Sequence, residues 1–212
     1  MQFVELKNPR VLDILERFRY LYREKYDITK TNKHFGKTMV AEDWVSEDYL
    51  RKVLSMGKRH EGVPTGANSY FIRPDGYFGD DPQYDEDWVQ INDKTKLDIG
   101  LRCTALAQLY PPKGFIDWHN NANASAYNVV FTWSETGDGW FKWYDIENDK
   151  IVTMKDKKGW SCKVGYFASY DDEKPVTYHC AYTDCWRMTF SYTLGFNQDF
   201  WLDMIDYIQC ED

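Results

Sequence analysis

The sequence predicts a mostly β fold with flanking helices, arranged as a double-sheet jelly roll. Aromatic residues make up 17% of the 212-residue chain, and aromatic side chains are enriched in strands. From about residue 68, apolar residues stop recurring at helical spacing and form short β-branched and aromatic runs separated by turn residues. Helical patterns precede and follow these runs, an order that favours two β layers with helices packed on one side.

Helices are expected towards both ends of the chain. Apolar residues recur three and four positions apart after Pro9, which predicts a helix over residues 9–25, behind a short first strand at 2–6. Ser46 is expected to cap a second helix, because Glu and Asp follow it in the first turn. Asn197 is expected to cap a final amphipathic helix.

The strands are predicted from β-branched and aromatic composition between turn signals. They span residues 69–73, 98–109, 127–133, 140–144, 151–154, 161–167, 177–181 and 186–194. The turn at 135–139 predicts that the strands on either side of it pair as a hairpin. We expect one domain over residues 1–212, with helical support in 1–65, a jelly-roll core in 66–196 and a C-terminal helix in 197–212.

Charge and cysteine content narrow the class of protein. The formal net charge is −8 and no long basic stripe offsets it, which argues against nucleic-acid binding through phosphate neutralisation. No apolar run approaches the length of a membrane span. Five cysteines form an odd set without a Cys-x-x-Cys pair, which fits reduced thiols and predicts a cytoplasmic protein. An acidic run at 79–87 is expected to be a solvated loop, because it lacks the spacing of a calcium-binding loop.

Candidate functional residues come from two stretches that lie far apart in the chain. His119 and His179 are expected on separate strands, and neutral imidazole is a good ligand for Fe(II). Arg187 and Thr189 fall on one face of the last predicted strand. An arginine inside a barrel can hold a carboxylate through its two-pronged fork.

The first stretch resembles a known motif. Tyr110, Gly114 and His119 resemble the Tyr…Gly…His-x-Asp opening of the 2-oxoglutarate and Fe(II)-dependent dioxygenases, in particular their prolyl-hydroxylase-like branch. His179 resembles the distal histidine of that family. The resemblance covers roughly residues 66–196 and extends to the short oxygenase-like proteins common in bacteriophage genomes.

The second stretch completes the resemblance. Arg187 and Thr189 resemble the Arg-x-Ser pair that holds the far carboxylate of 2-oxoglutarate, and Tyr110 is implied as a further contact of this cosubstrate. The resemblance implies a double-stranded β-helix, a cupin-like jelly roll. It also implies an enzyme that uses Fe(II), 2-oxoglutarate and O₂ to hydroxylate an unidentified protein, peptide or small-molecule substrate.

The third metal ligand departs from the family pattern. Where the family has His-x-Asp or His-x-Glu, this chain has His119, Asn120 and Asn121. An amide oxygen is a neutral and weaker ligand than a carboxylate. Three arrangements stay open: Asn121 coordinates through its oxygen, Asp117 turns in from the other side of His119, or the site holds metal poorly and is inactive.

Other interpretations stand beside this one. The chain can instead be a catalytically inactive jelly-roll structural or binding protein, for example part of a virion. A zinc site built from His179, Cys180 and Cys185 is disfavoured, because adjacent strand residues point to opposite faces. The other two histidines are expected at the surface, and the loop at 73–88 is a candidate lid or substrate rim.

Overall fold

The structure is a computed structural model that describes residues 1–31, 34–72, 81–195 and 197–211. The described strands are β1 (Gln2–Val4), β2 (His34–Phe35), β3 (Ala67–Phe71), β4 (Cys103–Tyr110), β5 (Gly114–His119), β6 (Ala126–Ser134), β7 (Gly139–Asp145), β8 (Lys150–Lys155), β9 (Gly159–Phe167), β10 (His179–Thr183) and β11 (Arg187–Gly195). The described helices are α1 (Pro9–Tyr20), the π-helical turn η1 (Leu21–Lys25), α2 (Ile28–Thr31), α3 (Ala41–Trp44), α4 (Glu47–Met56), the 3₁₀ turn η2 (Gly57–Arg59), α5 (Pro82–Ile99) and α6 (Gln198–Gln209).

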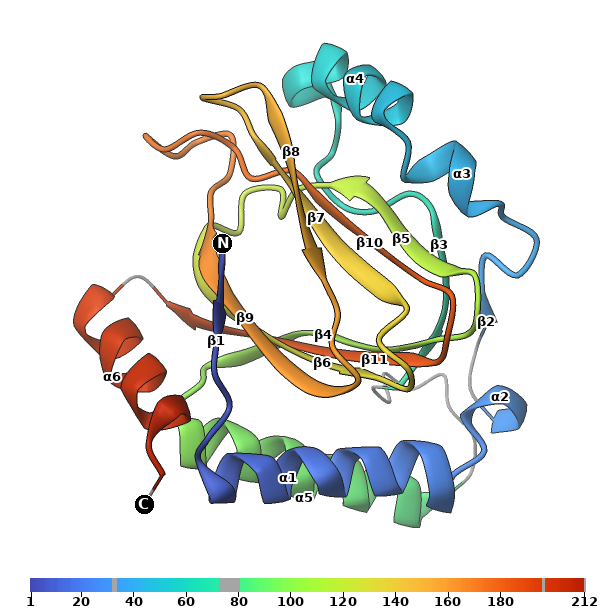
Figure 1. Ribbon diagram of the computed structural model, residues 1–212, viewed down its shortest axis with the longest axis vertical. Coiled ribbons are helices and arrows are strands. Elements are labelled where there is room, and N and C mark those ends of the chain that lie inside the picture. The colour runs from blue at the N-terminus through green and yellow to red at the C-terminus, as the bar shows by residue number, and fades with distance from the viewer. Residues whose placement is uncertain (32–33, 73–80, 196, 212) are drawn as a thin grey trace.

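The strands form two curved layers that face each other (Figure 1). The larger layer has the order β1-β9-β6-β11-β4 and the smaller layer the order β5-β10-β7-β8, while β3 pairs with both β4 and β5 and joins the layers. From β4 to β11 consecutive strands alternate between the layers, except that β7 and β8 pair with each other in the smaller layer. The pairings within each layer are antiparallel. This is the strand order of a double-stranded β-helix, so the predicted jelly-roll fold is confirmed.

Helix α1 begins where the sequence predicts. The Asn8 side chain accepts hydrogen bonds from the backbone N–H groups of Arg10 and Val11, and Pro9 fits the first helical position. The buried face of the helix packs on the outer surface of the larger layer, where the rings of Phe18 and Phe190 lie 4.1 Å apart. The predicted caps of α4 and α6, Ser46 and Asn197, are also confirmed.

Helix α5 corrects two predictions. The acidic run at 79–87 is not a loop over its described part, because Asp81 caps a helix that begins at Pro82 and continues to Ile99. The strand predicted at 98–109 therefore starts only at Cys103. Gly100, with a positive φ of 75°, ends the helix in the left-handed conformation that glycine adopts readily.

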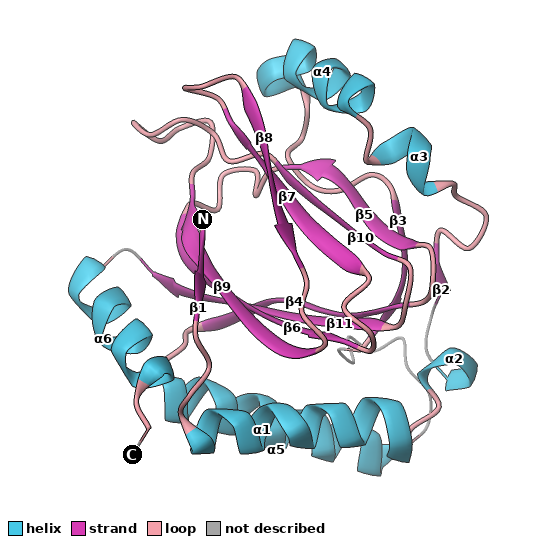
Figure 2. Ribbon diagram, in the orientation of Figure 1, coloured by secondary structure: helices cyan, strands magenta, loops and turns pink. Residues whose placement is uncertain are grey.

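The apolar stripe of α5 is obscured by the acidic and amide residues around it. Its buried residues recur at helical spacing and are Tyr84, Asp87, Trp88, Ile91, Asn92, Thr95 and Ile99. Carboxylates in the first turn also suit a helix, because the N-terminal end carries partial positive charge. The helix packs beside α1 (Figure 2). The predicted lid at 73–88 is thus wrong for residues 82–88, while residues 73–80 lie outside the described residues.

The hairpin predicted around the turn at 135–139 is also wrong. β6 pairs with β9 and β11, whereas β7 pairs with β8 and β10. The turn carries the chain from the larger layer to the smaller one, and Glu135 donates its backbone N–H to the carbonyl oxygen of Trp186 instead of closing a two-stranded ribbon. Local turn chemistry indicates a reversal of the chain but not the layer that the next strand joins.

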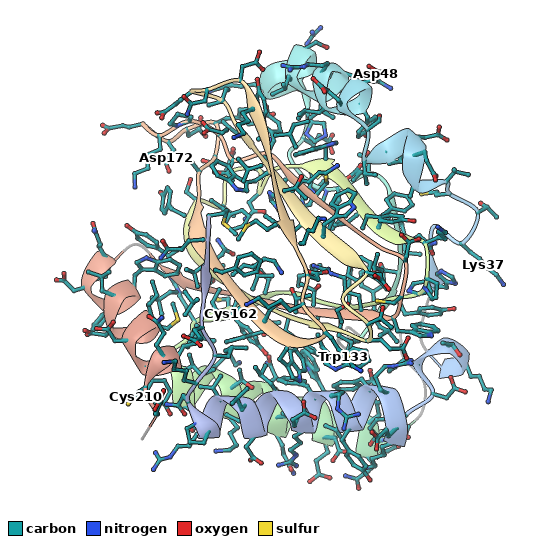
Figure 3. The ribbon with its side chains drawn as sticks, viewed as in Figure 1. Lys37, Asp48, Trp133, Cys162, Asp172 and Cys210 are labelled. Atoms are coloured by element: carbon teal, nitrogen blue, oxygen red, sulfur yellow. The ribbon has the colours of Figure 1, made fainter. Side chains whose placement is uncertain are left out.

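The sequence predicted helices packed on one side of the fold. This is wrong, because helices cover the outer faces of both layers. Leu50 and Val53 of α4 pack with Trp118 and Cys180 on the outer face of the smaller layer. The side chains of Cys162 and Trp133, labelled in Figure 3, belong to the separate core between the larger layer and α1. Among the described residues, no helix is both long and apolar enough to cross a membrane.

Replacing Phe190 with Ala tests the packing of helices on the larger layer. Phe190 is fully buried against Phe18, so the substitution removes a large side chain from a closed site and should lower the free energy of unfolding by about 3–5 kcal/mol. Urea denaturation measures this change. Leu97→Ala is the control, because Leu97 is 82% exposed and should change stability by no more than about 0.5 kcal/mol. Equal effects would contradict the packing described here.

Candidate functional site

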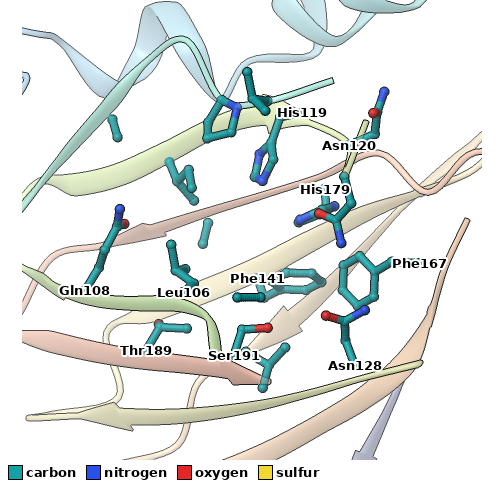
Figure 4. A pocket seen from close by; sticks show the side chains of 18 of the residues that line it. Leu106, Gln108, His119, Asn120, Asn128, Phe141, Phe167, His179, Thr189 and Ser191 are labelled. Atoms are coloured by element: carbon teal, nitrogen blue, oxygen red, sulfur yellow. The ribbon is translucent and has the colours of Figure 1, made fainter. Parts of the chain in front are cut away.

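A cavity of about 550 Å³ lies between the two layers. Side chains from β4, β6 and β11 line one wall, and side chains from β5, β7 and β10 line the other (Figure 4). The structure brings together six residues singled out in the sequence, and all of them line this cavity: Tyr110, His119, Asn121, His179, Arg187 and Thr189.

The two histidines face each other across the β5–β10 pair. His119 and His179 are register partners, and their ring centroids lie 4.2 Å apart. The Nδ1 atom of His119 lies 2.7 Å from the backbone oxygen of Asp117, and that of His179 lies 3.2 Å from the backbone oxygen of Thr177. A carbonyl only accepts, so each Nδ1 carries the proton and each Nε2 keeps a free lone pair. This is how proteins orient imidazoles that bind metals.

Burial keeps both imidazoles neutral. It lowers the pKa of His119, although the Asp117 carboxylate nearby partly opposes this effect. It lowers the pKa of His179 further, and the neighbouring His119 adds to the decrease. The rings of Phe141 and Phe167 pack against His179 and help to exclude water. Neutral imidazole is the form that coordinates a metal.

Asp117 turns away from the cavity. Its Oδ2 atom accepts hydrogen bonds from the backbone N–H groups of Thr65 and Gly66, at 3.1 and 2.8 Å, and from the Thr65 hydroxyl at 2.9 Å. A β-bulge explains this orientation, because Ile116 and His119 both line the cavity although they are three residues apart. The extra residue reverses the alternation of side chains, so Asp117 does not share the face of His119 as simple parity predicts.

Asn121 is the remaining oxygen donor of the predicted set. It is half-buried, follows His119 by two residues in the chain, and lines the same cavity as His119 and His179. Within the described ranges, no group of three His, Cys, Asp or Glu side chains is placed to hold a metal ion. The candidate donors on the cavity wall are thus two imidazole nitrogens and one amide oxygen, a neutral set that lacks the carboxylate expected from the resemblance.

The other two histidines were predicted to lie at the surface, and for His60 this prediction is wrong. His60 is only 4% exposed, and its Nδ1 atom accepts a hydrogen bond from the backbone N–H of Gly62. The same turn also holds the chain just after β5, because the carbonyl oxygen of Gly62 accepts a hydrogen bond from the backbone N–H of Asn120. His34 is half-buried, and its Nε2 atom lies 2.7 Å from the side-chain oxygen of Asn68. Helix and loop composition alone gave no sign of this burial.

The other end of the cavity contains a buried arginine. Arg187 is 1% exposed, and its Nη1 donates to the hydroxyl of Thr189 at 2.6 Å. Its Nε donates to Oδ2 of Asp156 at 2.8 Å, and the other oxygen of Asp156 accepts from Lys163 at 2.9 Å. The guanidinium carbon lies 5.5 Å from the centre of the Tyr110 ring.

Two buried polar atoms near Arg187 have no hydrogen-bond partner among the described residues. They are the hydroxyl of Tyr110 and Oε1 of Gln108, and both side chains line the cavity. Burial raises the pKa of Tyr110, so its hydroxyl stays protonated and can donate. Unpaired buried polar groups are costly, and a polar ligand in the cavity would satisfy them.

Several residues of the site were missed in the sequence. Asp156 lies in a turn whose composition is typical of solvent exposure. Lys163 stands between the apolar residues Cys162 and Val164, and this alternation places it on the opposite face of β9 from them. Phe35, Val63 and Pro64 line the cavity from the segment predicted only to support the barrel. Phe35 reaches the site through the pairing of β2 with β3, whereas Val63 and Pro64 lie just before β3 in the chain. No local sequence pattern specifies this placement.

No protein-family model matches this chain, and no curated protein matches it. Among solved structures, it is similar to a prolyl-4-hydroxylase from Pseudomonas putida, with 13% identity and a TM-score of 0.34 over 87% of this chain and 98% of that one. It is also similar to a prolyl hydroxylase from Trichoplax adhaerens in complex with a hypoxia inducible factor peptide, with 12% identity and a TM-score of 0.40 over 92% of both chains.

A third similar structure is the viral collagen prolyl hydroxylase of Paramecium Bursaria Chlorella virus-1 in complex with 2OG. The identity is 11% and the TM-score 0.35, over 77% of this chain and 94% of that one. At these identities and TM-scores the likenesses concern the fold and do not assign a function.

The neutral histidines predict acid sensitivity. An unfolded histidine takes up a proton near its ordinary pKa of 6.5, whereas burial lowers the pKa of His119 and His179 in the folded chain. The unfolded state therefore binds more protons as the pH falls below about 6.5, and the free energy of unfolding should decrease by up to about 1.4 kcal/mol per pH unit for each histidine.

Urea denaturation of the metal-free protein at pH 7.5 and 5.5, in the presence of a chelator, measures this decrease. The variant with His119→Gln and His179→Gln is the control and should lose most of the pH dependence. An unchanged pH dependence in that variant would show that other groups cause it.

Proposed function

We propose that this chain is a 2-oxoglutarate- and Fe(II)-dependent dioxygenase-like protein that hydroxylates an unidentified protein or small-molecule substrate. One observation supports this most. Two neutral imidazoles with free Nε2 lone pairs share a cavity with a buried arginine, and the Tyr110 hydroxyl and Gln108 Oε1, which have no partner among the described residues, line the same cavity. A metal chelate at one end and a carboxylate at the other match the two ends of a 2-oxo dicarboxylic acid.

In this proposal the residues that line the cavity divide into metal ligands and cosubstrate-binding residues. His119 and His179 would hold the iron through Nε2, and Asn121 would supply its side-chain oxygen. The iron would supply the activation of O₂. Arg187 would bind the distal carboxylate of 2-oxoglutarate through its Nη atoms, which are oriented by the Thr189 hydroxyl.

The remaining wall residues shape the chemistry. The Tyr110 hydroxyl would donate to the same cosubstrate, since it has no partner among the described residues. Phe35, Val63 and Pro64 give the cavity an apolar rim, which would exclude water and accept the apolar part of a substrate. The cytoplasmic location predicted above, and the absence of a nucleic-acid or membrane partner, stay predictions.

A second candidate function has its own supporting observation. Asp117 is held away from the cavity by Thr65 and Gly66, so within residues 1–31, 34–72, 81–195 and 197–211 no carboxylate is placed to join His119 and His179 around a metal. A jelly-roll binding or structural protein that kept the scaffold without the activity is consistent with this arrangement. Metal binding separates the two candidates.

An anaerobic titration with Fe(II) and 2-oxoglutarate provides that test. The proposed enzyme should develop a saturating visible metal-to-ligand charge-transfer band, because the keto acid chelates the bound iron. His179→Ala should abolish the band, whereas the control His34→Ala, outside the cavity, should retain it. If the unmodified chain gives no band and neither ligand raises its melting temperature, the oxygenase proposal is wrong.

Replacing Asn121 with Asp should strengthen metal binding. The substitution adds a negative charge beside two neutral imidazoles, and Coulomb attraction to a divalent ion in a buried site should improve the affinity at least about tenfold. Calorimetric titration with Mn(II) measures the dissociation constant. The matched control is Asn148→Asp on an exposed turn, which should leave it unchanged. Equal affinities for all three proteins would place the metal elsewhere.

A further inference from the structure

Three charged side chains are buried together behind the arginine end of the cavity. Arg187, Asp156 and Lys163 are 1%, 7% and 0% exposed, and Asp156 accepts from both cations, at 2.8 and 2.9 Å. Arg187 comes from β11 and Lys163 from β9, while Asp156 follows β8. The group therefore links the larger layer to the end of the smaller one.

The carboxylate is packed firmly in place. The backbone N–H of Asp156 donates to the carbonyl oxygen of Gly139 at 2.9 Å. A Cβ atom added at Gly139 would lie 2.7 Å from Oδ2 of Asp156, so the glycine is needed for this close approach. Burial alone would raise the pKa of Asp156, but Arg187 and Lys163 outweigh that effect and hold it below its usual range. Asp156 is thus ionised.

Charge counting shows what Lys163 contributes. Arg187 and Asp156 alone would form a neutral pair, and a neutral pair attracts an anion weakly. Lys163 adds a second cation through its contact with Asp156; burial lowers the pKa of Lys163 and the Asp156 carboxylate opposes this effect. With Lys163 protonated, the group keeps one net positive charge. Only Arg187 of the three lines the cavity; Lys163 acts on a ligand through Asp156 and not by contact.

The stability of the fold does not account for a buried lysine. Removing two charges from water costs several kcal/mol per ion, and buried ion pairs can often be replaced by apolar residues without loss of stability. Lys163 therefore calls for another explanation, and its place behind an anion-binding arginine supplies one.

The free donors of Arg187 point to the ligand. Nε is occupied by Asp156 and one Nη1 hydrogen by Thr189, while Nη2 has only a long contact of 3.5 Å to the hydroxyl of Thr132. Among the described residues, no closer acceptor occupies Nη2, and Arg187 lines the cavity together with Tyr110, whose hydroxyl has no partner in this part of the chain.

We propose that Lys163 is a positioning residue that neutralises Asp156, so that Arg187 keeps one full positive charge for a single carboxylate group. This inference rests on the role of Arg187 in the proposed function and adds to it the residues that set the charge of the subsite. One net charge, one available Nη edge and one tyrosine hydroxyl suit a carboxylate better than a doubly charged phosphate.

Calorimetric titration of the full-length chain with 2-oxoglutarate, in anaerobic buffer containing Mn(II), tests this proposal. Lys163→Met leaves Arg187 neutralised by Asp156, and the affinity should fall at least tenfold. Lys163→Arg retains the charge and should bind within threefold of the original protein. The double variant Lys163→Met with Asp156→Asn again leaves one positive charge and should recover most of the lost affinity.

A second ligand separates charge from general damage to the cavity. 2-Oxobutyrate has the keto-acid end but no distal carboxylate, so Lys163→Met should not change its affinity. Circular dichroism melting checks that each variant is folded. If Lys163→Met does not fold, Lys163→Gln, which keeps a hydrogen-bond donor towards Asp156, takes its place with the same expected loss.

The outcomes are distinct. If Lys163→Met or Lys163→Gln binds 2-oxoglutarate as tightly as the original protein, or loses 2-oxobutyrate equally, the charge-setting role is wrong while the proposed function stands. If the original protein binds neither ligand, the proposed function fails, and this inference fails with it.

Discussion

The antiparallel pairing of β5 with β10 is the constraint on which the candidate site depends. Its register places His119 opposite His179, and the backbone carbonyls two residues before each ring fix both Nδ1 atoms. The bulge in β5 decides which side chains reach the cavity: it admits His119 and sends Asp117 to the backbone of Thr65 and Gly66. Because of this one extra residue, the Asp117 carboxylate does not reach the cavity, and the candidate donors beside His119 are neutral imidazole and amide groups.

The cavity has two ends of different electrostatic character. At one end the protein offers neutral nitrogen and amide-oxygen donors, because burial suppresses protonation of both imidazoles. At the other end three buried charges leave an excess of one positive charge. A ligand that bridges the ends needs metal-chelating oxygens on one side and an anionic group on the other, which is the basis of the proposed cosubstrate.

The high aromatic content stabilises the walls more than it fills the cavity. Phe18, Tyr22, Trp88 and Phe190 pack between the helices and the outer face of the larger layer, and Trp118 packs beneath α4 on the smaller layer. With both outer faces covered, the inner faces can keep polar side chains and an open volume between them. The helices α5 and α4 therefore support the site without contributing to its chemistry.

The sequence by itself determined the fold class, the helix start at Pro9, the helix caps at Ser46 and Asn197, and six of the residues that line the cavity. Strand composition, cap chemistry and motif spacing depend on residues that are close in the sequence, so they can be predicted from the sequence alone. Only the tertiary structure decided the partners of β6 and β7, the helix hidden in the acidic run and the orientation of Asp117. It also decided the burial of Asp156 and Lys163 behind Arg187. Strand pairing, bulges and buried ion groups arise from contacts between residues distant in the chain, and those contacts leave no fixed spacing in the sequence.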